Sequence, residues 1–138
     1  MTPTLRGRWQ TRLLLFLTIG LGITAVFGRL YRDLPTAFSI LGYMLVFGLV
    51  WDMVYFWLQS RRWDHDWSPA LYVAGAVWEA IVMIGCIKFL DLPGVPRDFG
   101  VLKFLLQYGA VWAGTLLFAF GPMRILFPRW RFRGGQWL

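Results

Sequence analysis

The chain has 138 residues, of which 58% are hydrophobic, 19% aromatic and only 15% charged, and its net charge is +7. Soluble domains contain about 25% charged residues, and a chain of this length has room for one domain with one small core. The composition therefore argues against a water-soluble domain. Because the arginines flank apolar segments, the positive charge indicates contact with anionic lipid headgroups and not with nucleic acid.

Four apolar segments are long enough to cross a bilayer, which takes about 20 helical residues. The first covers residues 13–30 between Arg12 and Arg29, and it is short unless these side chains extend toward the headgroups. We expect it to stay uncleaved, because no small-x-small motif follows it. The other three cover residues 36–58, 69–90 and 101–127, and proline-containing turns separate them.

These segments predict an all-α integral membrane protein with four transmembrane helices in an up-down-up-down bundle. Residues 1–138 then form a single transmembrane domain with short basic N- and C-terminal tails. In this topology the termini and the middle loop share one side, which holds nine of the 14 lysines and arginines. The positive-inside rule places both termini in the cytoplasm, in a multi-pass protein of the inner or plasma membrane.

Two carboxylates interrupt the apolar segments, Asp52 in the second and Glu79 in the third. A carboxylate in mid-membrane costs about 2.5–3.5 kcal/mol on insertion scales, so such residues usually face the interior of a bundle. Counted from the connecting loop, the two lie at depths that differ by only about 4.5 Å along the helix axes. We therefore expect both acids in one polar seam.

Each acid shares a helix face with glycine and with other polar residues. On the second helix this face holds Gly48, Tyr55 and Gln59, and on the third it holds Tyr72 and Gly75. Glycine allows close helix packing, and a tyrosine hydroxyl can donate a hydrogen bond to a carboxylate. The expected intramembrane polar or ion-binding site is therefore Asp52, Glu79, Tyr55, Tyr72 and Gln59.

Three functions fit this seam. The acids stabilise the bundle or contact a partner, which makes the chain a subunit or interaction partner of a larger membrane assembly. Alternatively, they share a proton or bind a cation in a small, oligomeric proton- or cation-coupled transporter. In a further arrangement the acids pair with an arginine of another helix. Asp52, which lies nearer the cytoplasmic side, could also extend toward Arg61 or Arg62. The third function is binding of a lipid headgroup or prenyl phosphate.

The loop after the second segment alternates charged and aromatic residues, and we expect it to lie at the lipid-headgroup interface: Arg61, Arg62, Trp63, Asp64, His65, Asp66 and Trp67. Arg61 and Arg62 suit a lipid phosphate. Asp64, His65 and Asp66 are acid–base candidates only if the chain acts on lipid at the interface. A single histidine makes a poor transition-metal site.

No nucleotide-binding, hydrolase or zinc-protease motif is present. We therefore predict no catalytic residues, no metal and no cofactor, and the sequence favours a role without enzymatic activity over an enzyme acting at the interface. The expected partners are anionic membrane lipids together with further copies of the chain or other membrane subunits.

Overall fold

The computed structural model describes residues 4–133 and 136, and these residues form helices and connecting loops. Four helical segments are long and apolar enough to cross a membrane, Leu5–Tyr31, Leu34–Arg61, Pro69–Phe89 and Val101–Leu126. This confirms the predicted class, an all-helical chain with four candidate spans. Residues 1–3, 134–135 and 137–138 of the expected tails lie outside the described part of the chain.

The first span begins at Leu5, although the sequence predicted residue 13. Its parts are α1 (Leu5–Leu15), the π-helical turn η1 (Phe16–Gly20) and α2 (Leu21–Tyr31). The Thr4 side chain caps the start by accepting a hydrogen bond from the Gly7 N–H at 3.1 Å. Because the helix begins at Leu5, it includes Arg12 and Arg29, which the sequence analysis placed at the two ends of the span.

The next two spans are single helices with a proline in the first turn, where no backbone N–H is needed. They are α3 (Leu34–Arg61) and α4 (Pro69–Phe89). Asp33 caps α3 by accepting a hydrogen bond from the Thr36 N–H at 3.3 Å. Both helices therefore begin close to the predicted positions.

The last span is interrupted, whereas the sequence predicted a continuous segment over residues 101–127. Helix α5 (Val101–Phe120) stops at Gly121, and α6 (Pro122–Leu126) follows, then the 3₁₀ turn η2 (Trp130–Arg133). Proline at position 122 cannot supply the backbone N–H that a continuous helix needs, which explains the break.

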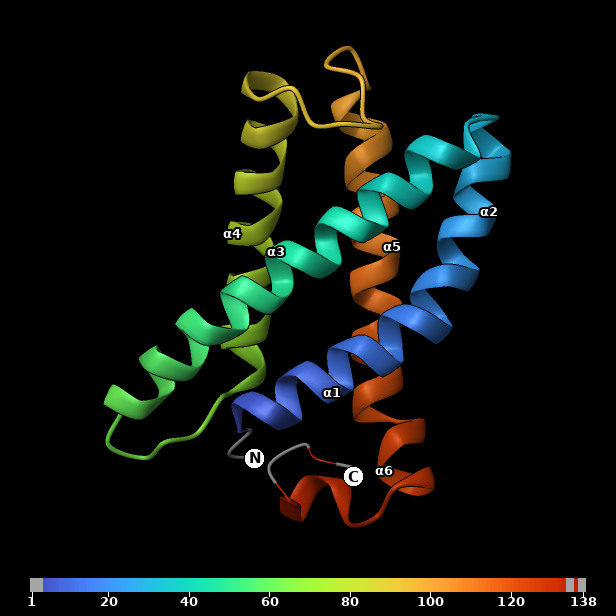
Figure 1. Ribbon diagram of the computed structural model, residues 1–138. Coiled ribbons are helices and arrows are strands. Elements are labelled where there is room, and N and C mark those ends of the chain that lie inside the picture. Colours follow the sequence, from blue (N-terminus) through green and yellow to red (C-terminus); the bar gives the residue numbers. More distant parts are fainter. Residues whose placement is uncertain (1–3, 134–135, 137–138) are drawn as a thin grey trace.

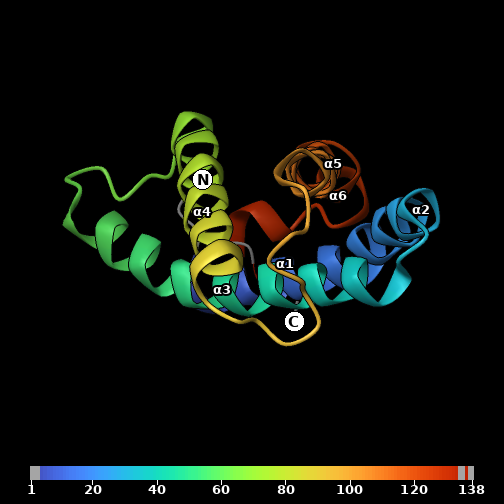
Figure 2. The ribbon, with the colours of Figure 1, turned by 90° about the horizontal axis from the view of Figure 1, so that it is seen from above.

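The first span and α3 pack along each other, and α4 and α5 lie against one face of this pair (Figures 1 and 2). The main core lies between these layers. It contains Ile40 and Met44 of α3, Met83 of α4, and Phe104 and Val111 of α5.

A smaller core closes one end of the molecule, where the C-terminal segment returns to α1 (Figure 1). Leu15, Met123 and Trp130 are its buried members. The Trp130 indole N–H donates a hydrogen bond to the Thr11 hydroxyl at 2.9 Å. The two ends of the described chain are thereby joined beside the site described next.

Candidate functional site

An arginine of α1 joins the two predicted acids. Arg12 donates from Nε and Nη2 to Oδ2 and Oδ1 of Asp52, at 2.8 and 2.9 Å. Its Nη1 lies 3.6 Å from Oε2 of Glu79. Asp52 is only 3% exposed, so its negative charge is balanced by a two-point contact inside the protein. Its partner is thus Arg12, an arginine of another helix, and not Arg61 or Arg62.

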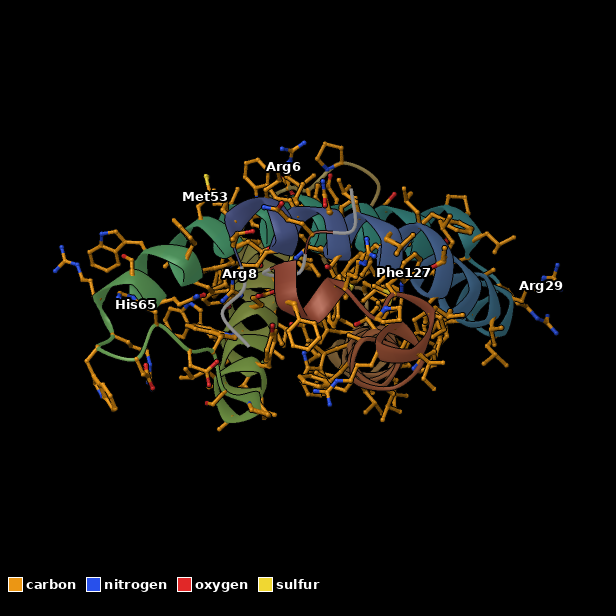
Figure 3. All side chains as sticks on the ribbon, turned by 90° about the horizontal axis from the view of Figure 1, so that it is seen from below. Arg6, Arg8, Arg29, Met53, His65 and Phe127 are labelled. Carbon is orange, nitrogen blue, oxygen red and sulfur yellow. The ribbon has the colours of Figure 1, made fainter. Side chains whose placement is uncertain are left out.

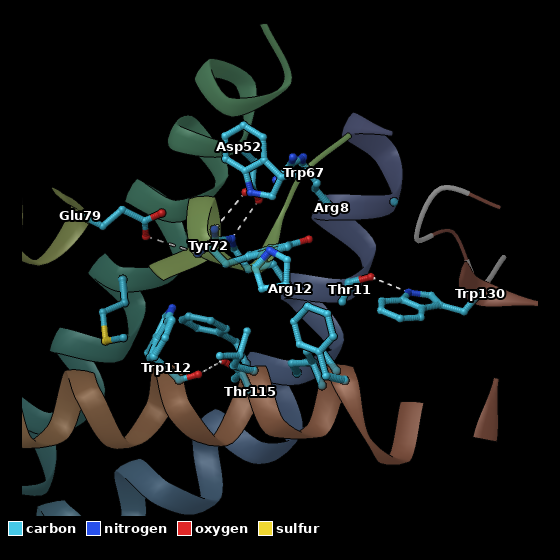
Figure 4. Close-up of a pocket in the computed structure, with 18 of the residues that line it drawn as sticks. Arg8, Thr11, Arg12, Asp52, Trp67, Tyr72, Glu79, Trp112, Thr115 and Trp130 are labelled. Carbon is cyan, nitrogen blue, oxygen red and sulfur yellow. Dashed lines mark hydrogen bonds and ion pairs between the residues drawn. The ribbon is translucent and has the colours of Figure 1, made fainter. Parts of the chain in front are cut away.

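The other Glu79 oxygen belongs to a second hydrogen bond. The Tyr55 hydroxyl lies 2.9 Å from Glu79 Oε1 and 3.2 Å from the carbonyl oxygen of Gly75. Tyr55 therefore ties α3 to α4 at the depth of the ionic contacts. Arg12, Asp52, Glu79 and Tyr55 form one network, which we call the ionic centre. Figure 4 shows Arg12 with the two acids.

Two glycines make room for the ionic centre. A Cβ atom on Gly48 would overlap the guanidinium of Arg12, and one on Gly75 would lie 3.0 Å from the Tyr55 hydroxyl oxygen. The two glycines that precede the acids by four residues therefore admit polar side chains of the neighbouring helix, in addition to allowing close helix approach.

Arg8 lies one turn before Arg12 and also points inward, whereas Arg6 and Arg29 point away from the protein (Figure 3). It is 7% exposed. Its Nη2 donates to Oε1 of Gln59 at 2.9 Å, and its guanidinium lies 4.6 Å from the centre of the Trp67 ring. Its Nε has no hydrogen-bond partner among the described residues, and no described carboxylate forms an ion pair with it.

A cavity of about 260 Å³ lies beside these arginines. Arg8, Arg12, Asp52 and Glu79 form its charged side, together with Tyr72 and Trp67. The facing wall comes mainly from α5 and is largely apolar, with Trp112, Leu116, Ala119 and Phe120. Arg124 of α6 and Asp66 of the α3–α4 loop also line it, as does Trp130, which contacts Thr11 of α1 (Figure 4).

Four of the five residues expected to form the intramembrane site lie in the ionic centre or on the cavity wall, and the fifth, Gln59, contacts Arg8. Asp52, Glu79 and Tyr55 belong to the ionic centre, and Tyr72 lines the cavity. Gln59 accepts from Arg8 and donates from Nε2 to the His65 carbonyl oxygen at 2.8 Å, which fixes its amide.

The seven loop residues separate into inward and outward groups. Trp67 is 6% exposed and stacks on Arg8, so it belongs to the cavity and not to an outer interface, and Asp66 also lines the cavity. The other five lie at or near the surface. Trp63 is 92% exposed, His65 takes a left-handed backbone conformation (φ 51°), and Arg61 stacks on Trp57 with 4.1 Å to the ring centre.

Arg62 and Asp64 pair with each other in this loop and not with the cavity. Arg62 Nε and Nη2 donate to the Asp64 carboxylate at 3.1 and 3.0 Å. These hydrogen bonds lower the pKa of Asp64 below its ordinary value. The sequence predicted headgroup-contacting arginines in this loop, whereas the arginines that line the cavity are Arg8, Arg12 and Arg124.

The sequence did contain a signal for these missed arginines. Arg8 and Arg12 are four residues apart, which places them on one face of a helix. Thr4 is a suitable N-cap for a helix that includes both. Because basic residues before an apolar segment are usually interfacial, the common inward face of Arg8 and Arg12 was not recognised.

Within the described residues, no group of three or more histidine, cysteine, aspartate or glutamate side chains is placed to hold a metal ion. Comparison of the chain with protein-family models, with curated proteins and with solved structures finds no match. Function must therefore be argued from the cavity and its charges.

Proposed function

We propose that this small multi-pass membrane protein binds an amphiphilic ligand in the cavity between α1, α4 and α5. The observation that supports this proposal is the division of the cavity wall. Its α1 and α4 side carries Arg8, Arg12 and Glu79, and its α5 side carries Leu116 and Phe120. A ligand with a polar head and an apolar tail satisfies both sides.

The size of the cavity agrees with part of such a ligand. Ligand pockets are commonly about 300–1,000 Å³, and this cavity is about 260 Å³. A headgroup and the beginning of one chain fit that space, and the remainder of the chain extends into lipid. The ligand thus belongs to the membrane phase, as in the third function derived from the sequence, with different arginines.

The contacts favour an amphiphile over a transported cation. Both oxygens of Asp52 accept hydrogen bonds from Arg12, and Glu79 lies beside the same guanidinium. A cation would have to displace Arg12, because the positive charge that these acids need is already present. A proton- or cation-coupled transporter built on Asp52 and Glu79 alone is therefore the weaker proposal.

We also propose the topology that the charge distribution favours, an up-down-up-down bundle in the inner or plasma membrane with both termini cytoplasmic. The side that contains the N-terminus then carries nine of the 14 lysines and arginines. In this orientation the cavity opens near the cytoplasmic leaflet. A role as a subunit of a larger assembly, or as a homo-oligomer, is compatible with ligand binding.

Native mass spectrometry of the protein released gently from lipid nanodiscs tests the proposed function. We expect one amphiphile to remain bound per chain and to be lost in Leu116→Trp, which fills the apolar wall. Leu102→Trp is the matched control, because Leu102 is on α5 but 70% exposed and outside the cavity. Equal lipid retention by both variants would contradict the proposal, and a stoichiometric protein partner would support the subunit role.

A further inference from the structure

Arg8 is a buried cation whose hydrogen-bonding capacity is incompletely used. It is 7% exposed, yet its Nε finds no acceptor among the described residues. Buried guanidinium groups are normally paired, because the loss of water must be compensated. Arg12, one turn away, has this compensation from Asp52 and Glu79. Among the described residues, the hydrogen-bond acceptor of Arg8 is the neutral amide of Gln59.

The surroundings of Arg8 hold it in place. Gln59 occupies its Nη2, and Gln59 is itself fixed by its hydrogen bond to the carbonyl oxygen of His65. The Trp67 indole covers one face of the guanidinium at 4.6 Å. A guanidinium fixed in this way loses little freedom when an acceptor arrives, which favours binding.

The charges on the cavity wall also leave a place for an anion next to Arg8. Asp52 and Glu79 are occupied by Arg12. Asp66 lines the cavity but forms no ion pair with Arg8. Arg124 adds a second cation at the end near η2, where its guanidinium lies 5.1 Å from the centre of the Phe120 ring.

We propose that Arg8 is the headgroup-binding residue of the cavity and that the ligand is an amphiphile with an anionic phosphate or carboxylate head. This inference rests on the proposed function and specifies its ligand class. The guanidinium binds an oxygen of the anion through the donors of its terminal nitrogens that Gln59 does not occupy, and the fork geometry of arginine suits both phosphate and carboxylate. The apolar chain then lies along Leu116 and Phe120 of α5.

Two amphiphiles with the same chain and different charge provide the test. Dodecyl phosphate has an anionic head, whereas dodecylphosphocholine carries the same phosphate capped by a cation. We expect the protein, held in amphipol at ligand concentrations below micelle formation, to bind dodecyl phosphate at least ten-fold more tightly. Inorganic phosphate is the third probe, and we expect it to bind far more weakly because it lacks the chain.

Arg8→Gln should reduce the preference for dodecyl phosphate to less than three-fold. Arg61→Gln is the matched control, because it removes the same charge from an exposed site outside the cavity, and its preference should stay at the wild-type value. Arg8→Lys retains the charge without the fork and should give an intermediate preference. Near-ultraviolet circular dichroism verifies that each variant is folded, and the comparison of headgroups in the wild type needs no variant.

The outcomes separate this inference from the proposed function. Equal binding of both amphiphiles by the wild type would overturn the anionic class and leave amphiphile binding intact. An unchanged preference in Arg8→Gln would overturn the role of Arg8. If neither amphiphile binds, the proposed function is overturned. If inorganic phosphate binds as tightly as dodecyl phosphate, the site belongs to a free anion and not to an amphiphile.

Discussion

The two-point contact between Arg12 and Asp52 governs the interior of this protein at the scale of single residues. Neither charge is stable alone in a dry bundle, because desolvation of an unpaired ion costs several kcal/mol. Glu79 shares the same arginine at 3.6 Å and is held by Tyr55. Removing one partner should therefore lower the free energy of unfolding by more than the lost hydrogen bonds alone contribute.

Asp52→Asn should destabilise the protein by about 3–5 kcal/mol, since it leaves a buried guanidinium without its main counterion. Equilibrium unfolding in mixed micelles measures this loss. Asp64→Asn is the control, because the Arg62–Asp64 pair is solvent-exposed and such pairs contribute little. Equal unfolding curves for wild type and Asp52→Asn would show that the contact does not stabilise the bundle.

Glycines 42 and 48 provide a second test within α3. Gly48→Ala places a methyl group where the Arg12 guanidinium lies, so we expect a loss of about 1–3 kcal/mol. Gly42→Ala meets nothing within 4 Å and should be neutral or stabilise the helix by up to about 1 kcal/mol. The same unfolding assay compares the stabilities of the two variants. If Gly42→Ala were the less stable variant, Arg12 would not approach α3 at Gly48.

At the scale of the elements, the spans followed from the sequence while several of their boundaries did not. Apolar runs identified four helices, because each must satisfy its backbone hydrogen bonds internally in lipid. The break at Gly121 was hidden because the residues on both sides are apolar. The start at Leu5 was missed because α1 carries several polar and basic residues, whose inward orientation depends on tertiary partners.

The same limit explains which part of the site was predictable. Asp52 and Glu79 stood out because charge is costly in an apolar segment. Arg8 and Arg12 did not, because basic residues at a helix end are also what the positive-inside rule expects. The return of Trp130 to Thr11 joins residues 119 positions apart, and no local pattern encodes that contact.

The α3–α4 loop should depend on pH in a defined direction. The hydrogen bonds from Arg62 lower the pKa of Asp64, so this contact is fully present above the ordinary aspartate pKa and is lost as the pH falls through the lowered value. Below that pH the Asp66 N–H, which donates to Asp64 Oδ1 at 3.3 Å, should exchange faster relative to a loop reference amide. Hydrogen exchange measures this, and Asp64→Asn should abolish the dependence.

At the scale of the whole molecule, the exposed apolar surface is what a lipid-facing bundle requires. Leu17, Val46, Ile81 and Leu117 are each more than half exposed and belong to the four different spans. In water such a surface would drive aggregation, whereas in lipid it carries no penalty. The buried charged residues of the described chain, Arg8 and Asp52, both line the cavity.

The proposed orientation predicts which loops a membrane-impermeant maleimide reaches. In a Cys86→Ala background, Asp98→Cys in the α4–α5 loop should react in intact cells, because that loop is on the outer side. Trp63→Cys lies in the α3–α4 loop, and the Trp63 side chain is 92% exposed. It should react only after the membrane is permeabilised. The opposite pattern would invert the topology, and labelling of both in intact cells would contradict four spans.

The π-helical turn η1 has a consequence for the spacing of residues in the first span. A π turn accommodates one residue more than an α-helical turn, and each residue of an α-helix rotates the chain by about 100°. Deleting one residue from Phe16–Gly20 would thus convert the π turn into an α-helical turn and leave Arg8 and Arg12 facing α3, with Thr24 and Gly28 in position. A deletion elsewhere between Arg12 and Gly28 would instead rotate the arginines by about 100° relative to Gly28. Related chains with this cavity should therefore tolerate the loss of one residue at η1 more readily than elsewhere in this stretch.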